Sequence, residues 1–293
     1  MIHLLAIDID GTLLDSRGRL PDLHRDAVVD AAGRGVSVAL VTGRSFHFAQ
    51  PIADLLPIPL TLIVNNGAVV KSKAGATIVR HALARRTARE ILERTPDHET
   101  NVALVFDYDP ASGSVDNSRR QVVFERMDWT APNRKGYYEK NKAFIAPSTG
   151  PLVEALIEDP IQVMFNGAVE AMRSLAVHLK ALPCCGEISV ALTEYPKRDF
   201  SLVDVNRAGC SKGSTLAHWS AAQGWSPANV MAVGDNLNDV EMLDFAGTAY
   251  VMANAEEGLK TRGYRLTASN DEGGLARAID EELGEIQSDY KNS

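Results

Sequence analysis

The stretch LLAIDIDGTLLD, residues 4–15, decides the fold, because a short apolar run ends there on two closely spaced carboxylates. Asp8 and Asp10 stand two residues apart, and Gly11 follows them. The apolar run has the length of a buried strand, and the glycine behind it predicts a tight turn. Two like charges at one strand end repel each other unless a cation neutralises them. The rest of the chain must therefore supply a reason for keeping them together.

Four further apolar runs end in polar or glycine-bearing turns in the same way. They are VSVALV before Thr42, LTLIV before Asn65, NVMAV before Gly234 and TAYVM before Ala253. Segments with helical periodicity lie between several of them, at residues 23–34 and 214–223. Strands that alternate with helices predict an α/β fold, a doubly wound and mainly parallel sheet covered by helices on both faces.

The middle of the chain follows a different pattern. A helix is predicted at residues 84–94, and the runs VALVFDY and QVVFERM flank a long turn, which indicates a hairpin. ISVALTE and FSLVDV indicate a second hairpin, and PIQVMFNG precedes a predicted helix at residues 169–182. We therefore expect an α/β core formed by residues 1–83 and 206–293, interrupted by an inserted α+β domain over residues 84–205.

Composition excludes several classes of protein. The chain has 293 residues and a formal net charge of −8, so it has no bulk attraction for nucleic acid or anionic membranes. Its three cysteines form no CxxC pattern, which disfavours a thiolate zinc site. Cys184 and Cys185 are adjacent and poorly placed to pair, which leaves only Cys210 and disfavours a disulfide framework. No apolar run approaches the roughly 20 residues that span a bilayer, and no signal-peptide pattern is visible. We expect a cytoplasmic protein with no nucleic-acid or membrane partner, as a monomer or weak homo-oligomer.

The carboxyl ends of parallel strands meet at one edge of a sheet, where ligands bind. That rule places the polar residues behind the apolar runs in one pocket: Asp8, Asp10, Thr42, Asn66, Asp235, Asn238 and Asp239. Clustered carboxylates suit Mg²⁺, which takes one or two of them and accepts a phosphate oxygen. Lys212 adds a positive charge, while the Thr42 hydroxyl and the Gly43 N–H are ligands for anions. These groups together predict Mg²⁺-assisted phosphoryl transfer.

Four short motifs occur in the order DIDGT, VTGR, CSKG and GDNLND. In order and spacing they resemble the motifs of the haloacid dehalogenase (HAD) superfamily. NNGA at residues 65–68 and the stretch from residue 234 to residue 260 resemble the Cof-type phosphatases of that superfamily, which carry an α+β cap of the C2B type between the second and third motifs. The resemblance is close over the predicted core and extends only to position and coarse pattern in the inserted domain.

The resemblance implies a role for each acidic residue. Asp8 would be the catalytic nucleophile that accepts the phosphoryl group, and Asp10 would be the general acid and then the general base. Mg²⁺ would be held by Asp8, Asp235 and the backbone carbonyl of Asp10, with Asp239 binding it directly or through water. Ion-pumping relatives carry threonine at the position of Asp10, so an acid there favours rapid turnover of phosphate esters.

The same resemblance implies the residues that bind substrate. Thr42, Gly43 and Lys212 would hold the phosphoryl oxygens, which makes Lys212 part of the catalytic set as well. Asn238 would orient Lys212 or contact the phosphate. Arg44 has two interpretations, since it either faces the pocket or braces its own turn. A last position, Asn66, is either a turn residue or a neighbour of the substrate.

We expect a Mg²⁺-dependent phosphatase that acts on small phosphate monoesters, with sugar phosphates first by family frequency. A phosphomutase on the same fold and a non-catalytic phosphometabolite-binding protein remain alternatives. A mutase would need a bisphosphate activator and would not release phosphate. A binding protein would usually lack the nucleophile, the acid or a metal ligand, all of which are present here. The cap would choose the substrate, and its sequence does not disclose which one.

Overall fold

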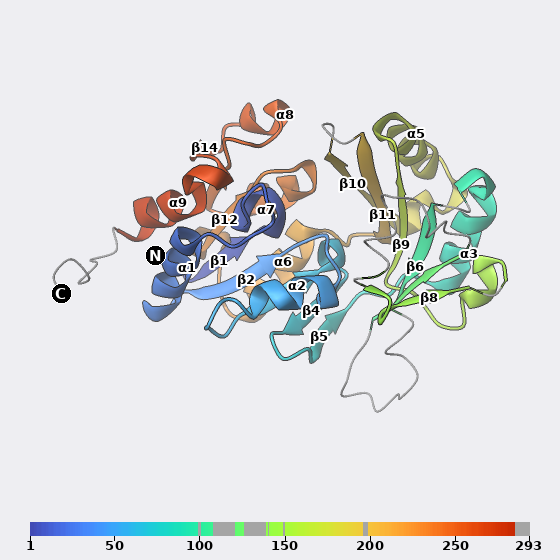
Figure 1. The fold of residues 1–293 in the computed structure, drawn as a ribbon, viewed down its shortest axis with the longest axis horizontal. Helices are drawn as coiled ribbons and strands as arrows, with labels where there is room; N and C mark the ends of the chain where they lie inside the picture. The colour runs from blue at the N-terminus through green and yellow to red at the C-terminus, as the bar shows by residue number, and fades with distance from the viewer. Residues whose placement is uncertain are drawn as a thin grey trace. The chain divides into compact units, whose positions relative to one another are not determined.

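The computed structural model describes residues 1–98, 101–107, 121–125, 139, 141–148, 150–195 and 199–284 (Figure 1). The chain divides into two compact units, one formed by residues 1–74 and from residue 212 onward, the other by residues 75–211. The predicted inserted domain, residues 84–205, lies inside the second of these ranges. Each unit is described by itself.

The first unit is built on a mainly parallel sheet with the strand order β14-β13-β12-β1-β2-β3-β4 (Figure 1). Its strands are β1 (Leu4–Ile7), β2 (Ser37–Val41), β3 (Thr61–Val64), β4 (Val69–Ser72), β12 (Val230–Gly234), β13 (Thr248–Val251) and β14 (Arg265–Leu266). Only β4 is antiparallel to its neighbour, β3. Each apolar run named above corresponds to one of these strands, so that prediction is confirmed.

Strand β1 shows why this sheet needs helices on both sides. Successive side chains of a strand point to opposite faces. All four residues of β1 are nonetheless buried, with at most 1% of any of them exposed. A strand buried on both faces reads as a continuous apolar run rather than an alternating one, which is the pattern of LLAI.

Helices cover this sheet. They are α1 (Asp22–Gly33), α2 (Phe46–Ala53), α6 (Lys212–Ala222), α7 (Val240–Phe245), α8 (Glu257–Lys260) and α9 (Gly274–Leu283). Helix α1 packs against α9, and α6 packs against α7. The predicted helices at residues 23–34 and 214–223 correspond to α1 and α6, with ends shifted by one or two residues.

The second unit contains a mixed sheet with the strand order β10-β11-β9-β6-β7-β8. The strands of this sheet are β6 (Val102–Val105), β7 (Val122–Phe124), β8 (Ile145–Pro147), β9 (Gln162–Gly167), β10 (Ile188–Tyr195) and β11 (Phe200–Arg207). The unit also contains α3 (Arg85–Arg94), α5 (Val169–Lys180) and β5 (Thr77–Arg80), a strand outside this sheet. Both predicted hairpins are confirmed, because β6 pairs antiparallel with β7 and β10 with β11. The long turn predicted between the first pair lies outside the described residues, as does most of the turn between the second.

One face of this second sheet carries the core of the unit. Alternate strand residues, such as Leu104, Phe165 and Val203, pack with Ile91 of α3 and Leu175 of α5. Helices gathered on one face of an antiparallel sheet are the α+β arrangement that the sequence predicts. Among the described residues, no helix is both long and apolar enough to cross a membrane.

Candidate active site

Asp8 follows β1, the strand that lies between β12 and β2 in the sheet. Its backbone N–H donates to the carbonyl of Val233 at 3.0 Å, so the parallel pairing continues one residue past the strand. The register sets Ile7 opposite Leu40 and Val233, which brings the ends of the three strands to the same edge of the sheet. The polar residues that follow them therefore converge, as the rule for parallel sheets predicts.

Lys212, the first residue of α6, is buried at the centre of this cluster. Its Nζ donates to Asp8 Oδ1 and to Asp239 Oδ1, both at 2.6 Å. The next residue, Gly213, lets α6 approach α7 closely, because a Cβ there would lie 2.3 Å from the backbone carbonyl carbon of Glu241. The glycine thus allows the helix to start deep enough for its lysine to reach both carboxylates.

The carboxylates outnumber the cation in this buried site. Burial raises the pKa of Asp8 from 3.8 to about 7, since Lys212 offsets the desolvation only in part and Asp239 adds to it. Burial, together with the charges of Asp8 and Asp239, also raises the pKa of Asp235. Burial disfavours the charged lysine, but Asp239 and Asp8 outweigh that effect and raise the pKa of Lys212. One ammonium therefore faces three carboxylates.

A divalent cation fits this excess of negative charge. One carboxylate oxygen from each of Asp8, Asp235 and Asp239 lies within 4.8 Å of the other two. The oxygens of Asp239 already accept hydrogen bonds, Oδ1 from Lys212 and Oδ2 from the N–H groups of Asp235 and Asn236 at 3.0 Å each. In Asp8, by contrast, Lys212 donates a hydrogen bond only to Oδ1. Oxygen donors of this kind are the ligands that hard divalent ions prefer.

Asp235 is held by two side chains, Thr12 and Asn254, that the sequence motifs did not assign to the site. Thr12 Oγ1 donates to Asp235 Oδ1 at 3.2 Å, and Asn254 Nδ2 approaches Asp235 Oδ2 at 3.4 Å. Asn254 also donates to the carbonyl of Gly11 at 2.9 Å. Both residues carried a detectable signal, because Thr12 lies in the DIDGT turn and Asn254 follows strand β13 at the same sheet edge. The strand-end rule points to Asn254, which follows the run TAYVM, but the sequence alone gives it no role.

The turn after Asp10 is compact because it contains a glycine. Gly11 has a φ of +82°, and a Cβ at this position would lie 2.1 Å from Asp235 Oδ2. Only glycine fits both requirements. Beside it, the Asp10 carboxylate forms a two-bond ion pair with Arg44, from Nε to Oδ2 at 2.7 Å and from Nη2 to Oδ1 at 2.6 Å.

The turns after β2 and β3 form the other wall of the cluster. The Thr42 hydroxyl accepts from the N–H of Arg44 at 3.1 Å, and the Thr42 carbonyl accepts from the N–H of Asn66 at 3.0 Å. Gly43 faces the Asn66 side chain, whose Oδ1 would lie 3.2 Å from a Cβ at that glycine. Asn66 is 2% exposed, and both it and Asn65 have positive φ, a conformation that asparagine tolerates better than most residues.

The structure joins Asn238 to this wall. Its Nδ2 donates to Asn66 Oδ1 at 3.0 Å, while its Oδ1 is buried without a hydrogen-bond partner. The two carboxylates that contact the Lys212 ammonium are Asp8 and Asp239. Of the two roles expected for Asn238, the structure thus offers no contact for orienting Lys212.

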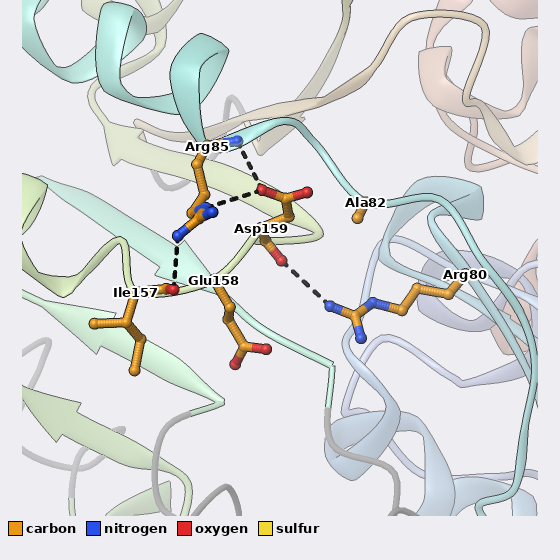
Figure 2. A pocket seen from close by; sticks show the side chains of 6 residues that line it. All are labelled: Arg80, Ala82, Arg85, Ile157, Glu158 and Asp159. Carbon is orange, nitrogen blue, oxygen red and sulfur yellow. Dashed lines mark hydrogen bonds and ion pairs between the residues drawn. The ribbon is translucent and has the colours of Figure 1, made fainter.

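A separate surface hollow lies within the second unit (Figure 2). Its two arginines are bound to the segment beside them. The Arg85 backbone N–H donates to Asp159 Oδ1 at 3.0 Å, its Nη1 donates to the Ile157 carbonyl at 2.9 Å, and Arg80 Nη2 donates to the Asp159 carbonyl at 3.3 Å. These hydrogen bonds connect residues 157–159 to Arg80 and to the start of α3. None of the predicted site residues lines this hollow.

Known proteins bear out the fold and the motif pattern. A sequence model of the haloacid dehalogenase-like hydrolase family matches residues 5–279, nearly the whole chain. The chain belongs to this family. The superfamily resemblance seen in the four motifs is therefore confirmed, and so is the expected fold class.

Relatives of this HAD protein include named phosphatases. It is 27% identical over 284 residues to the pyridoxal phosphate phosphatase YbhA of Escherichia coli strain K12, covering 94% of this chain and 97% of the relative. It is 26% identical over 281 residues to the 5-amino-6-(5-phospho-D-ribitylamino)uracil phosphatase YcsE of Bacillus subtilis strain 168, covering 95% and 94%. The protein is an enzyme of the phosphatase class.

Solved HAD structures share the fold. The structure of BT1666 from Bacteroides thetaiotaomicron, a phosphatase of the haloalkanoate (HAD) superfamily, aligns with a TM-score of 0.75 at 24% identity. The alignment covers 97% of this chain and 96% of that one. The core and the inserted α+β unit are thus both features of the shared fold.

Proposed function

We propose that the protein is a Mg²⁺-dependent phosphatase that hydrolyses small phosphate monoesters through an aspartyl-phosphate on Asp8. The observation that carries this proposal is the buried pair of Asp8 and Lys212, with Asp10 two residues away and a second carboxylate, Asp235, close by. Phosphate monoesters as substrates agree with the names of the relatives above, and sugar phosphates remain the first class to test. A cytoplasmic location belongs to the same proposal.

Two steps follow from this arrangement. In the first, an oxygen of Asp8 forms a bond to phosphorus and the ester P–O bond breaks, while the Asp10 carboxyl gives its proton to the leaving alcohol oxygen. In the second, Asp10 takes a proton from water, the water oxygen bonds to phosphorus, and the electron pair of the breaking bond returns to Asp8. Phosphate leaves, and Asp8 and Asp10 recover their starting states.

In this proposal the remaining residues neutralise and position the phosphoryl group. Lys212 lies beside Asp8, where its ammonium can neutralise a phosphoryl oxygen during transfer. Thr42 and Gly43 supply a hydroxyl and a backbone N–H at the same sheet edge. The expected contact of Asn238 with the phosphate remains part of the proposal.

Mg²⁺ would be held by Asp8, Asp235 and the backbone carbonyl of Asp10. Asp239, whose oxygens already have donors, would fix Lys212 and the turn that carries Asp235. When bound, the ion supplies positive charge that offsets the carboxylates and the phosphoryl oxygens.

A phosphate-release screen tests this function. The protein is incubated with Mg²⁺ and a panel of sugar phosphates, pyridoxal phosphate and p-nitrophenyl phosphate, and inorganic phosphate is measured. We expect turnover of at least one monoester that EDTA abolishes and added Mg²⁺ restores. Absence of turnover on the whole panel would contradict the proposal, and product that keeps the phosphoryl group would indicate a mutase.

The pH dependence of metal binding provides a further prediction. The pKa of Asp8 is raised from 3.8 to about 7, mainly by burial, so its protonated form favours the folded state. The contribution of protonated Asp8 to the free energy of unfolding is fully present below the unfolded pKa of 3.8, and it is lost as the pH rises through about 7. A cation binds the ionised form, so Mg²⁺ should stabilise more at pH 8 than at pH 5.5. At saturating Mg²⁺ we expect Tm to rise by about 5–10 °C at pH 8 and by less than half as much at pH 5.5.

Thermal unfolding in Mg²⁺ and in EDTA, at pH 8 and at pH 5.5, measures the Mg²⁺-dependent shift in Tm. In Asp235→Asn the Mg²⁺-dependent shift should be lost. Asp26→Asn is the charge-matched control, because Asp26 is an exposed carboxylate on α1, and it should keep the shift. An equal shift at both pH values, or a normal shift in Asp235→Asn, would refute the assignment of the cation to these carboxylates.

A further inference from the structure

The guanidinium of Arg44 forms two hydrogen bonds with the carboxylate of Asp10. Nε and Nη2 donate to different oxygens of the same carboxylate, at 2.7 and 2.6 Å, so the two planar groups face each other with two parallel bonds. This arrangement fixes the plane of the Asp10 carboxyl as well as its distance. A single-donor contact would leave that plane free to rotate.

Arg44 is itself held by further hydrogen bonds. Its Nη1 donates to the carbonyl of Phe48 in α2 at 3.3 Å. Its backbone N–H donates to the Thr42 hydroxyl at 3.1 Å, and its carbonyl accepts from Asn65 at 2.9 Å. The side chain and the backbone are thus tied to the turns after β2 and β3 and to the first turn of α2. Because these elements hold Arg44 in place, Arg44 in turn restricts the orientation of the Asp10 carboxylate.

Stability does not account for this construction. The side chains of Arg44 and Asp10 are 31% and 39% exposed, and ion pairs that reach solvent contribute little to folding free energy. Arg44 lies next to Thr42 and Gly43 and pairs with the residue that handles the proton in the proposed mechanism. Its position therefore indicates a role in the reaction.

We propose that Arg44 is the positioning residue of Asp10, holding the carboxyl in one orientation for proton transfer to the leaving alcohol and from water. This inference rests on the proposed function. A carboxylate offers about four lone-pair sites, of which Arg44 occupies two. The remaining sites can carry the proton that Asp10 gives away and later regains, so the pair with Arg44 persists through both steps.

Leaving groups of different basicity distinguish positioning from other roles. An alkyl phosphate needs a proton on its alcohol oxygen as the bond breaks, whereas p-nitrophenyl phosphate releases a stable anion that needs little help. Loss of a well-placed acid must therefore slow the alkyl ester more. The quantity to compare is kcat/KM, because it reports the steps up to release of the leaving group.

The variants are Arg44→Ala, Arg44→Lys and, as the matched control, Arg19→Ala. Arg19 also donates from Nε and Nη2 to a carboxylate in the same unit, that of Asp15, although both of its bonds go to Oδ2. We expect Arg44→Ala to lower kcat/KM about 100-fold on an alkyl phosphate and less than 10-fold on p-nitrophenyl phosphate. Arg44→Lys keeps the charge but lacks the planar pair of donors, and it should still lose at least 10-fold on the alkyl ester. Arg19→Ala should match the wild type on both.

The double variant Asp10→Asn/Arg44→Ala tests whether Arg44 acts through Asp10. If it does, adding Arg44→Ala to Asp10→Asn should change kcat/KM by no more than about 3-fold. Equal losses on both esters, full rescue by lysine, or a second full loss in the Asp10→Asn background would overturn the inference. The proposed function stands or falls separately, since it requires only that the wild type releases phosphate and Asp8→Asn does not.

Discussion

Asp8→Asn is expected to lower kcat by at least about 10³-fold on every monoester that the wild type hydrolyses. An amide has no anionic oxygen to attack phosphorus, and the other carboxylates described in the cluster already have partners. Asp235 accepts from Thr12 and Asn254. Asp239 has donors on both oxygens, and Asp10 is held by Arg44. The measurement is steady-state phosphate release with saturating Mg²⁺.

The same variant contains its own folding control. Asp8→Asn removes one of three carboxylates that share one buried ammonium, while Lys212 keeps its contact with Asp239. Because burial raises the pKa of Asp8 to about 7, the metal-free variant should be at least as stable as the wild type at pH 8. An inactive variant with an undiminished Tm in EDTA isolates the chemistry. Activity above one tenth of the wild type would rule out Asp8 as the nucleophile.

Asp10→Asn is expected to lower turnover by about 10²- to 10⁴-fold while leaving Mg²⁺ affinity largely intact. The side chain transfers protons in the proposed mechanism, whereas the metal contact uses the backbone carbonyl. With p-nitrophenyl phosphate the variant should release about one p-nitrophenolate per active site in a rapid burst. The first step needs little acid for this leaving group, but the second still needs the base. Stopped-flow absorbance measures the burst, and the Mg²⁺-dependent Tm shift reports the metal.

A second carboxylate in an arginine pair provides the control for this variant. Arg19 donates to Asp15 from Nε and Nη2, both to Oδ2, so Asp15→Asn also breaks an arginine–carboxylate pair, outside the cluster. It should leave turnover and the Mg²⁺ shift near wild type. If Asp10→Asn loses the Mg²⁺ shift, the division between side chain and carbonyl is wrong. Slow turnover without a burst would show that the first step limits the variant, which contradicts the expectation that hydrolysis does.

The sequence predicts the strands and the cluster at their ends because both follow from short-range rules. Buried parallel strands are continuous apolar runs, and their carboxyl ends share one edge. That reasoning places Asp8 and Asp235 together, and the structure does bring them together, with Lys212 of α6 bound to Asp8. Helix ends shift by only a residue or two, within the usual uncertainty of helix boundaries.

Side-chain pairing inside the site is harder to read from sequence. Arg44 had two open interpretations, since a turn residue can point either way until the path of the neighbouring turn is known. The structure resolves them by setting its guanidinium against Asp10, 34 positions earlier in the chain. Thr12 and Asn254 illustrate the same limit, because their contacts with Asp235 depend on how three turns meet. Substrate choice would depend on the inserted unit, whose sequence shows strands and helices but no ligand motif.

The most direct test of the central claim is to locate the phosphoryl group on the protein. Asp10→Asn is mixed with p-nitrophenyl phosphate and Mg²⁺, quenched during the burst, and treated with hydroxylamine, which converts an acyl phosphate to a hydroxamate. Peptide mass spectrometry then identifies the modified residue. We expect a hydroxamate at Asp8 in an amount that matches the burst. Modification at a different residue, or a full burst with an unmodified Asp8, would contradict the central claim.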